Sequence, residues 1–204
     1  MKAPKDFEKK RLNTSNVEEY LKKKFNTEDV QQISSKVLPI TPLLQNDYGE
    51  AGDCTLTSIT TCINYYRAGQ SAIQEIYDYV EKVAKKWGYN GNIGTFPLFI
   101  QYIYNKVLKK FPCVKKKTAQ RYFKNVGFNF NTIKNTINKS TPIVLSINND
   151  GRNYYKNHSI TIIGYKVFKV NKQTVNMLVV YDNWYANEAY VDFDALPVIA
   201  SINY

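Results

Sequence analysis

The spacing of apolar residues changes along the chain, and this change most constrains the fold. Up to about residue 138 they recur every three or four residues, and after it they alternate in steps of two. The first spacing is typical of a helix face and the second of a strand face. We predict helices over 17–25, 55–66, 71–86, 96–109 and 131–138, with a short one after Thr27. We predict strands over 142–147, 159–170, 175–181, 190–193 and 198–202. Helices followed by strands predict an α+β fold, with a helical N-terminal half packed on a C-terminal antiparallel β-sheet.

Length and loop composition predict the domain organisation. A chain of 204 residues suffices for one compact domain. Residues 1–15 are polar and are predicted to fray, and Pro39 and Pro42 open a loop over 39–53. We therefore predict an N-terminal helical extension over 1–38 and one domain over 39–204. No apolar stretch approaches the ~20 residues of a membrane helix, so no transmembrane segment is predicted.

The charge balance limits the classes of partner. The formal net charge is +11, from 28 Lys and Arg against 17 Asp and Glu. Such an excess favours anionic partners: a cell-envelope polymer, an acidic protein, a lipid surface or nucleic acid. Arginine, which dominates direct base readout, occurs only four times, and this disfavours nucleic acid. A solvated, lysine-rich surface accounts for the charge equally well.

The cysteines indicate free thiols. Cys54, Cys62 and Cys113 cannot all pair within one chain, and their spacing matches no CxxC metal motif. The single histidine, His158, cannot complete a Cys/His zinc site with them. We therefore expect no metal and no cofactor. Cys62, in an apolar run, is predicted to be a core residue.

Cys54 is a candidate nucleophile. It follows Gly52 and Asp53 at the point where a loop becomes an apolar helix. The partial positive charge at a helix start favours the thiolate, so we expect a lowered thiol pKa there. The alternative is that Cys54 is a small apolar residue that begins a helix.

A candidate base and its partner lie in the β half. His158 opens a strongly alternating strand, which gives a general base a rigid backbone at the rim of a sheet. Asp182, Asn183 and Trp184 follow the next strand, and a carboxylate there could accept a hydrogen bond from the imidazole. The alternatives are a histidine hydrogen-bonded at a strand end and ordinary turn residues.

The order of these residues resembles the papain-like cysteine peptidase superfamily, nearest its bacterial double-glycine (bacteriocin-processing) branch. The resemblance covers about residues 40–204. It implies that Cys54 is the nucleophile, His158 the base and Asp182 the orienting residue, with Asn183 as the fallback. It also implies a glutamine that completes the oxyanion hole, and Gln45 is the candidate. Gln45 lies nine residues before Cys54, where the family spacing is usually six.

The resemblance implies a thiol-dependent peptidase that hydrolyses peptide or isopeptide bonds through an acyl-enzyme, with a peptide or protein substrate. Two alternatives use the same fold. One is a catalytically inactive binding module that docks anionic cell-envelope polymers. The other is a cell-wall amidase or a transglutaminase-like acyl transferase with the same triad. We expect a bacterial protein that is secreted or at the cell surface, with a cytoplasmic location left open.

Overall fold

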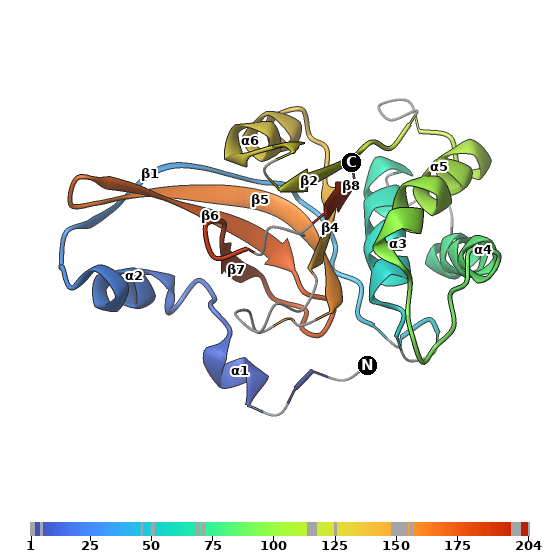
Figure 1. Cartoon of the computed structure of the whole chain (residues 1–204), viewed down its shortest axis with the longest axis horizontal. Helices are drawn as coiled ribbons and strands as arrows, with labels where there is room; N and C mark the ends of the chain where they lie inside the picture. Colours follow the sequence, from blue (N-terminus) through green and yellow to red (C-terminus); the bar gives the residue numbers. More distant parts are fainter. Residues whose placement is uncertain are drawn as a thin grey trace.

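The computed structural model of the chain describes residues 3–4, 6–45, 47–49, 52–67, 70, 72–113, 118–124, 126–147, 155, 157–196 and 201–203. Helices α3, α4 and α5 lie together at one end of a β-sheet, and α1, α2 and α6 lie along the sheet (Figure 1). The α+β class predicted from the change of hydrophobic period is confirmed.

The strands of the described residues form one sheet. Their bounds are β1 Val30–Val37, β2 Arg121–Lys124, β3 Gly127–Phe128, β4 Ile143–Ile147, β5 His158–Val170, β6 Gln173–Tyr181, β7 Ala189–Asp192 and β8 Ser201–Asn203. Across the sheet their order is β3-β2-β8-β4-β5-β6-β7, with β1 also beside β5. All pairs are antiparallel except the short pair β2–β3. The predicted antiparallel sheet in the C-terminal half is therefore confirmed.

Helices α2 to α6 follow the predicted apolar stripes, whereas α1 was not predicted. Their bounds are α1 Phe7–Lys10, α2 Val17–Phe25, α3 Cys54–Arg67, α4 Ile73–Lys85, α5 Ile100–Lys110 and α6 Phe130–Asn138. A 3₁₀ turn over Pro97–Phe99 precedes α5. The helix predicted over 71–86 corresponds to α4, and its predicted first residue, 71, lies outside the described residues.

Some element predictions are wrong. The chain after Thr27 forms strand β1 and no helix. The reason is that β5 is 13 residues long, and β4 pairs only with its residues 158–162. The remaining edge, residues 164–170, is open for β1, so pairing with distant residues decides the conformation. Strands β2 and β3 were not predicted, and the first residues of the strand expected over 198–202 lie outside the described ones.

The described core consists of two apolar clusters. The sheet core lies under β4 to β7 and contains residues of α1, α2 and α6, such as Leu21 and Ile133. The helical core lies among α3, α4 and α5, where Leu56, Ile76 and Ile103 are fully buried. The two cores meet at β4, because Val144 of that strand packs in the helical core. None of the helices described is both long and apolar enough to cross a bilayer.

Candidate active site

The start of α3 holds Cys54 in a fixed turn. Gly52 has a φ of 81°, and a Cβ at this position would lie 2.5 Å from the carbonyl oxygen of Gly91, so the turn requires glycine. The next residue, Asp53, is fully buried and accepts a hydrogen bond of 2.8 Å from the Tyr77 hydroxyl. These contacts fix the direction in which the helix begins and therefore the position of the thiol.

His158 is the first residue of β5 and is held on two sides. Its Nε2 lies 2.7 Å from the backbone carbonyl oxygen of Asp182. A carbonyl oxygen only accepts hydrogen bonds, so Nε2 carries the proton and Nδ1 keeps a free lone pair. The Trp184 indole stacks on the imidazole, with ring centroids 4.0 Å apart. The ring is thus fixed in the tautomer that allows Nδ1 to accept a proton.

The side chain of Asp182 points to a different partner than the sequence predicted. Its carboxylate is fully buried and accepts hydrogen bonds from Arg11 Nε at 2.5 Å and from the backbone N–H groups of Trp184 and Tyr185 at 3.1 and 3.2 Å. The contact with His158 comes from the carbonyl of the same residue. The structure therefore brings Asp182 to the imidazole through its backbone.

Asn183, the fallback for the orienting role, joins the two halves of the molecule instead. Its Nδ2 lies 3.0 Å from the carbonyl oxygen of Cys54, 2.8 Å from Ser58 Oγ and 2.9 Å from the carbonyl oxygen of Ser159. The amide thus connects the first turn of α3 to β5. No hydrogen bond in the structure connects it to His158.

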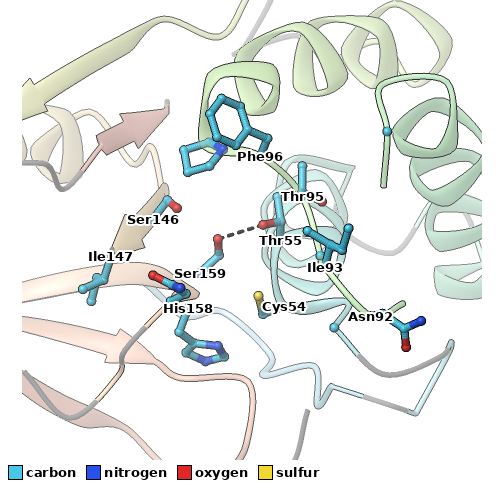
Figure 2. Close-up of a pocket in the computed structure, with 15 residues that line it drawn as sticks. Cys54, Thr55, Asn92, Ile93, Thr95, Phe96, Ser146, Ile147, His158 and Ser159 are labelled. Atoms are coloured by element: carbon cyan, nitrogen blue, oxygen red, sulfur yellow. Dashed lines mark hydrogen bonds between the residues drawn. The ribbon is translucent and has the colours of Figure 1, made fainter. Parts of the chain in front are cut away.

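A cavity of about 450 Å³ lies between α3 and β5, and both Cys54 and His158 line it (Figure 2). At its floor the hydroxyls of Thr55 and Ser159 lie 2.8 Å apart. Ile93 and Phe96, from the segment between α4 and α5, form part of the opposite wall. Among the described residues that line the cavity there is no Lys, Arg, Asp or Glu. The described lining is therefore free of ionised side chains, in a protein with a net charge of +11.

Gln45 is buried near these residues and does not line the cavity. Its backbone N–H donates to the carbonyl oxygen of Asn183 at 2.7 Å, and Asn183 in turn contacts Cys54. Both polar atoms of its side chain are buried without a hydrogen-bond partner in the described part of the chain. A buried amide with unused hydrogen-bonding capacity is compatible with the expected oxyanion role, which stays a prediction.

Burial shifts the pKa values of Cys54 and His158 so that both side chains favour their neutral forms. It raises the pKa of the Cys54 thiol, and a hydrogen bond from the Ser159 backbone only partly opposes this. The expected lowering of this pKa at the helix start is therefore wrong. Burial also lowers the pKa of His158 to about 4, against the effect of its hydrogen bond to the Asp182 carbonyl. The resting pair at neutral pH is thus a thiol and a neutral imidazole.

None of the three cysteines, all of them described, forms a disulfide, and they differ in accessibility. Cys54 is half-buried, whereas Cys62 and Cys113 are buried in the helical core. The prediction of a core position for Cys62 is confirmed. Cys54 is therefore the thiol best placed to meet a substrate.

Sequence reasoning missed the part of the site that comes from residues 1–15. Phe7 and Arg11 are buried, so the predicted fraying of this segment is wrong for them. The Phe7 ring contacts Trp184 edge-on at 4.8 Å, and Arg11 pairs with Asp182. A lone arginine within a polar stretch gives no local signal of burial, because its partner lies 171 residues away.

Comparison with known proteins agrees with the order of these residues. Residues 37–196, more than three quarters of the chain, match the Peptidase_C39 like family. A search of curated proteins finds no match to the chain. The matched range includes Cys54, His158 and Asp182 and leaves out Phe7 and Arg11.

Proposed function

The chain belongs to the Peptidase_C39 like family, which is papain-like, and from this premise we propose that it hydrolyses peptide or isopeptide bonds by thiol-dependent acyl transfer. In this proposal Cys54 is the nucleophile and His158 the general base. One observation carries it: Cys54 and His158 line the same cavity, and the His158 ring is held in the tautomer that leaves Nδ1 free to accept the thiol proton.

The proposed reaction begins with a neutral pair. As Cys54 Sγ attacks the substrate carbonyl, its proton moves to Nδ1 of His158, and a tetrahedral oxyanion forms. The Cys54 backbone N–H and the side-chain amide of Gln45 donate to this oxyanion. The imidazolium then protonates the leaving amine, the C–N bond breaks and a thioester remains. Water, deprotonated by the same nitrogen, hydrolyses the thioester, and the thiol regains its proton.

Asp182 aligns the base during these steps. Its carbonyl accepts the Nε2 hydrogen throughout, and this hydrogen bond strengthens when the ring becomes an imidazolium. We propose a peptide or protein as the substrate, since the cavity is large enough for several side chains and its described lining residues include polar and apolar groups but no Lys, Arg, Asp or Glu. An anionic cell-envelope partner and a location at the cell surface stay predictions of the net charge of +11.

The test compares Cys54→Ala with Cys62→Ala, a matched loss of one thiol in the same helix. Each variant is incubated with a mixed peptide pool, and new termini are read by mass spectrometry. Iodoacetamide labelling is mapped in parallel. We expect Cys54→Ala to lose cleavage and Cys62→Ala to keep it, with Cys54 as the alkylated residue. Full cleavage by Cys54→Ala, or alkylation of Cys113 in place of Cys54, would contradict the proposal.

A further inference from the structure

The N-terminal segment over residues 7–12 packs against the loop that holds His158. Phe7 contacts the rings of Trp184 and Tyr155 at centroid distances of 4.8 and 5.3 Å, and both rings stack on the imidazole. The segment continues to Leu12, whose carbonyl accepts a hydrogen bond from the Tyr190 backbone on β7. It therefore packs on this loop without lining the cavity.

Arg11 is the charged centre of this contact. Its side chain is 3% exposed, and its Nε lies 2.5 Å from the fully buried carboxylate of Asp182. Its two terminal nitrogens contact Asn187 at the side-chain oxygen, 3.0 Å away, and at the carbonyl oxygen, 2.5 Å away. The guanidinium also lies over the Tyr185 ring, 5.0 Å from its centroid. Arg11 thus holds the loop that follows β6 at three points.

This pairing decides which oxygen of Asp182 meets the imidazole. The carboxylate already accepts from Arg11 and from two backbone N–H groups, whereas the carbonyl accepts from His158. An ionised carboxylate is the stronger acceptor, so it would compete for the Nε2 hydrogen if it lost its cation. Among the described residues, the titratable groups around the imidazole are Cys54 from α3, Tyr155, and the Arg11–Asp182 pair.

We propose that Arg11 is a positioning residue of the peptidase: it neutralises Asp182 and holds its carboxylate aside, so that the Asp182 carbonyl fixes His158 as the Nε2–H tautomer. The proposal rests on the proposed function. It gives residues 7–12, which lie outside the range matched by the family, a role in the site. It differs from the arrangement that the sequence predicted, in which the carboxylate itself orients the ring.

The test uses the fact that the chain has one histidine. In protein labelled with ¹⁵N-histidine, the two ring nitrogen shifts report the tautomer of His158, and their pH dependence reports its titration. We compare Arg11→Gln, Arg11→Lys and the double variant Arg11→Gln/Asp182→Asn with the wild type. Phe7→Ala serves as a packing control and Lys9→Gln as an exposed charge control. The pH profile of Cys54 alkylation by iodoacetamide is a second measurement.

Removal of the cation alone exposes His158 to an unpaired carboxylate. We therefore expect Arg11→Gln to raise the midpoint of the His158 titration by about one to three pH units and to move the alkylation profile to lower pH. Arg11→Lys keeps the charge and should keep the wild-type midpoint. The double variant removes both charges, so it should keep the Nε2–H tautomer and return the midpoint to the wild-type value. Phe7→Ala should lower the melting temperature without the large rise of the midpoint that an unpaired carboxylate causes, and Lys9→Gln should change neither.

The outcomes separate this inference from the proposed function. A folded Arg11→Gln variant with the wild-type titration midpoint overturns the positioning role, while Cys54 can still be the nucleophile. If Arg11→Gln does not fold, the double variant decides: a retained Nε2–H tautomer supports the role of the carbonyl, and two averaged nitrogen shifts overturn it. Failure of the proposed function would instead show as full cleavage by Cys54→Ala.

Discussion

His158 links the chemistry of the site to the stability of the fold, because it is the only histidine and it is buried as a neutral ring. Burial lowers its pKa from 6.5 to about 4. Below pH 6.5 the unfolded chain therefore binds a proton that the folded chain resists. The free energy of unfolding falls as the pH drops from about 6.5 to about 4, and below that range this group adds no further loss.

We expect this loss to reach about 3 kcal/mol, since each unit of pKa shift corresponds to about 1.4 kcal/mol. Urea unfolding at pH 7 and pH 4 measures it for the wild type and for His158→Gln, whose amide can still reach the Asp182 carbonyl. Carboxylates titrate in both proteins, so the difference between them isolates the histidine. Equal pH dependence in the two proteins would show that His158 is not buried as the structure describes.

Gln45 is a residue at which stability and the proposed function make opposite demands. Its amide is buried without a partner among the described residues, which costs stability, while the proposed mechanism needs that amide for the oxyanion. We expect Gln45→Met to raise the free energy of unfolding by about 1–2 kcal/mol. We also expect it to lower kcat by about 100- to 1,000-fold.

Urea unfolding and peptide cleavage measure the two effects of Gln45→Met on one sample. Gln45→Glu is the control, because it keeps the size of the side chain and lacks the donor. A more stable variant with unchanged kcat would make Gln45 a packing residue and would remove it from the oxyanion hole.

The sequence predicted which residues gather at the site better than it predicted their atomic contacts. Cys54, His158 and Asp182 each stand at the junction of a loop with a helix or strand, and such junctions can be recognised locally. The choice between the carboxylate and the carbonyl of Asp182 depends on Arg11. That pair joins residues 171 positions apart, so no local pattern contains it.

At the scale of elements, the predictions hold where a segment packs through its own amphipathic pattern. Helix α2 was predicted with its observed bounds, and α3 begins one residue before the predicted start. Strand β1 has no such pattern, because Gln31, Gln32, Ser34 and Ser35 interrupt its apolar residues. It becomes a strand through its pairing with β5, which local spacing cannot show.

The turn before α3 is an element whose sequence requirement can be measured. Gly52 and Gly88 have similar φ values, 81° and 82°, but only at Gly52 would a Cβ meet another backbone, that of Gly91. Both Gly52→Ala and Gly88→Ala should carry the strain of a left-handed residue, about 1–3 kcal/mol. Gly52→Ala should cost more than Gly88→Ala and should also slow the alkylation of Cys54.

Urea unfolding and iodoacetamide kinetics on both glycine variants test this expectation. Gly88→Ala measures the backbone strain alone, so the difference between the variants reports the crowding at Gly91. Equal losses of stability, with Cys54 alkylated at the wild-type rate in both, would show that the turn tolerates a side chain.

At the scale of the whole molecule, the two apolar cores are joined by buried polar contacts at the active site. The Asn183 amide connects α3 to β5, and the Thr55 and Ser159 hydroxyls form a second contact. The site thus lies where the helical core and the sheet core meet. The predicted boundary between residues 38 and 39 stays a prediction about chain organisation, and β1 on its N-terminal side pairs with β5 on the other.

The two tryptophans report the two cores separately, because Trp87 packs on the helical core and Trp184 on the sheet core. A chain of 204 residues can unfold through intermediates, but here the buried contacts at the interface would lose their partners if one core opened alone. We therefore expect Trp87→Phe and Trp184→Phe, each with one tryptophan left, to show fluorescence transitions in urea that coincide with their own circular dichroism transitions.

Asn183→Gly is the matched perturbation of this coupling, since glycine tolerates the φ of 64° at this position and lacks the bridging amide. When Asn183→Gly is combined with Trp87→Phe and with Trp184→Phe, the urea midpoints of the two remaining tryptophan signals should fall by the same amount. A Trp87 signal that changes at a different urea concentration from the Trp184 signal would mean that the cores unfold independently. The active site would then lie between two separately stable halves, and its geometry would depend on their docking and no longer on one cooperative fold.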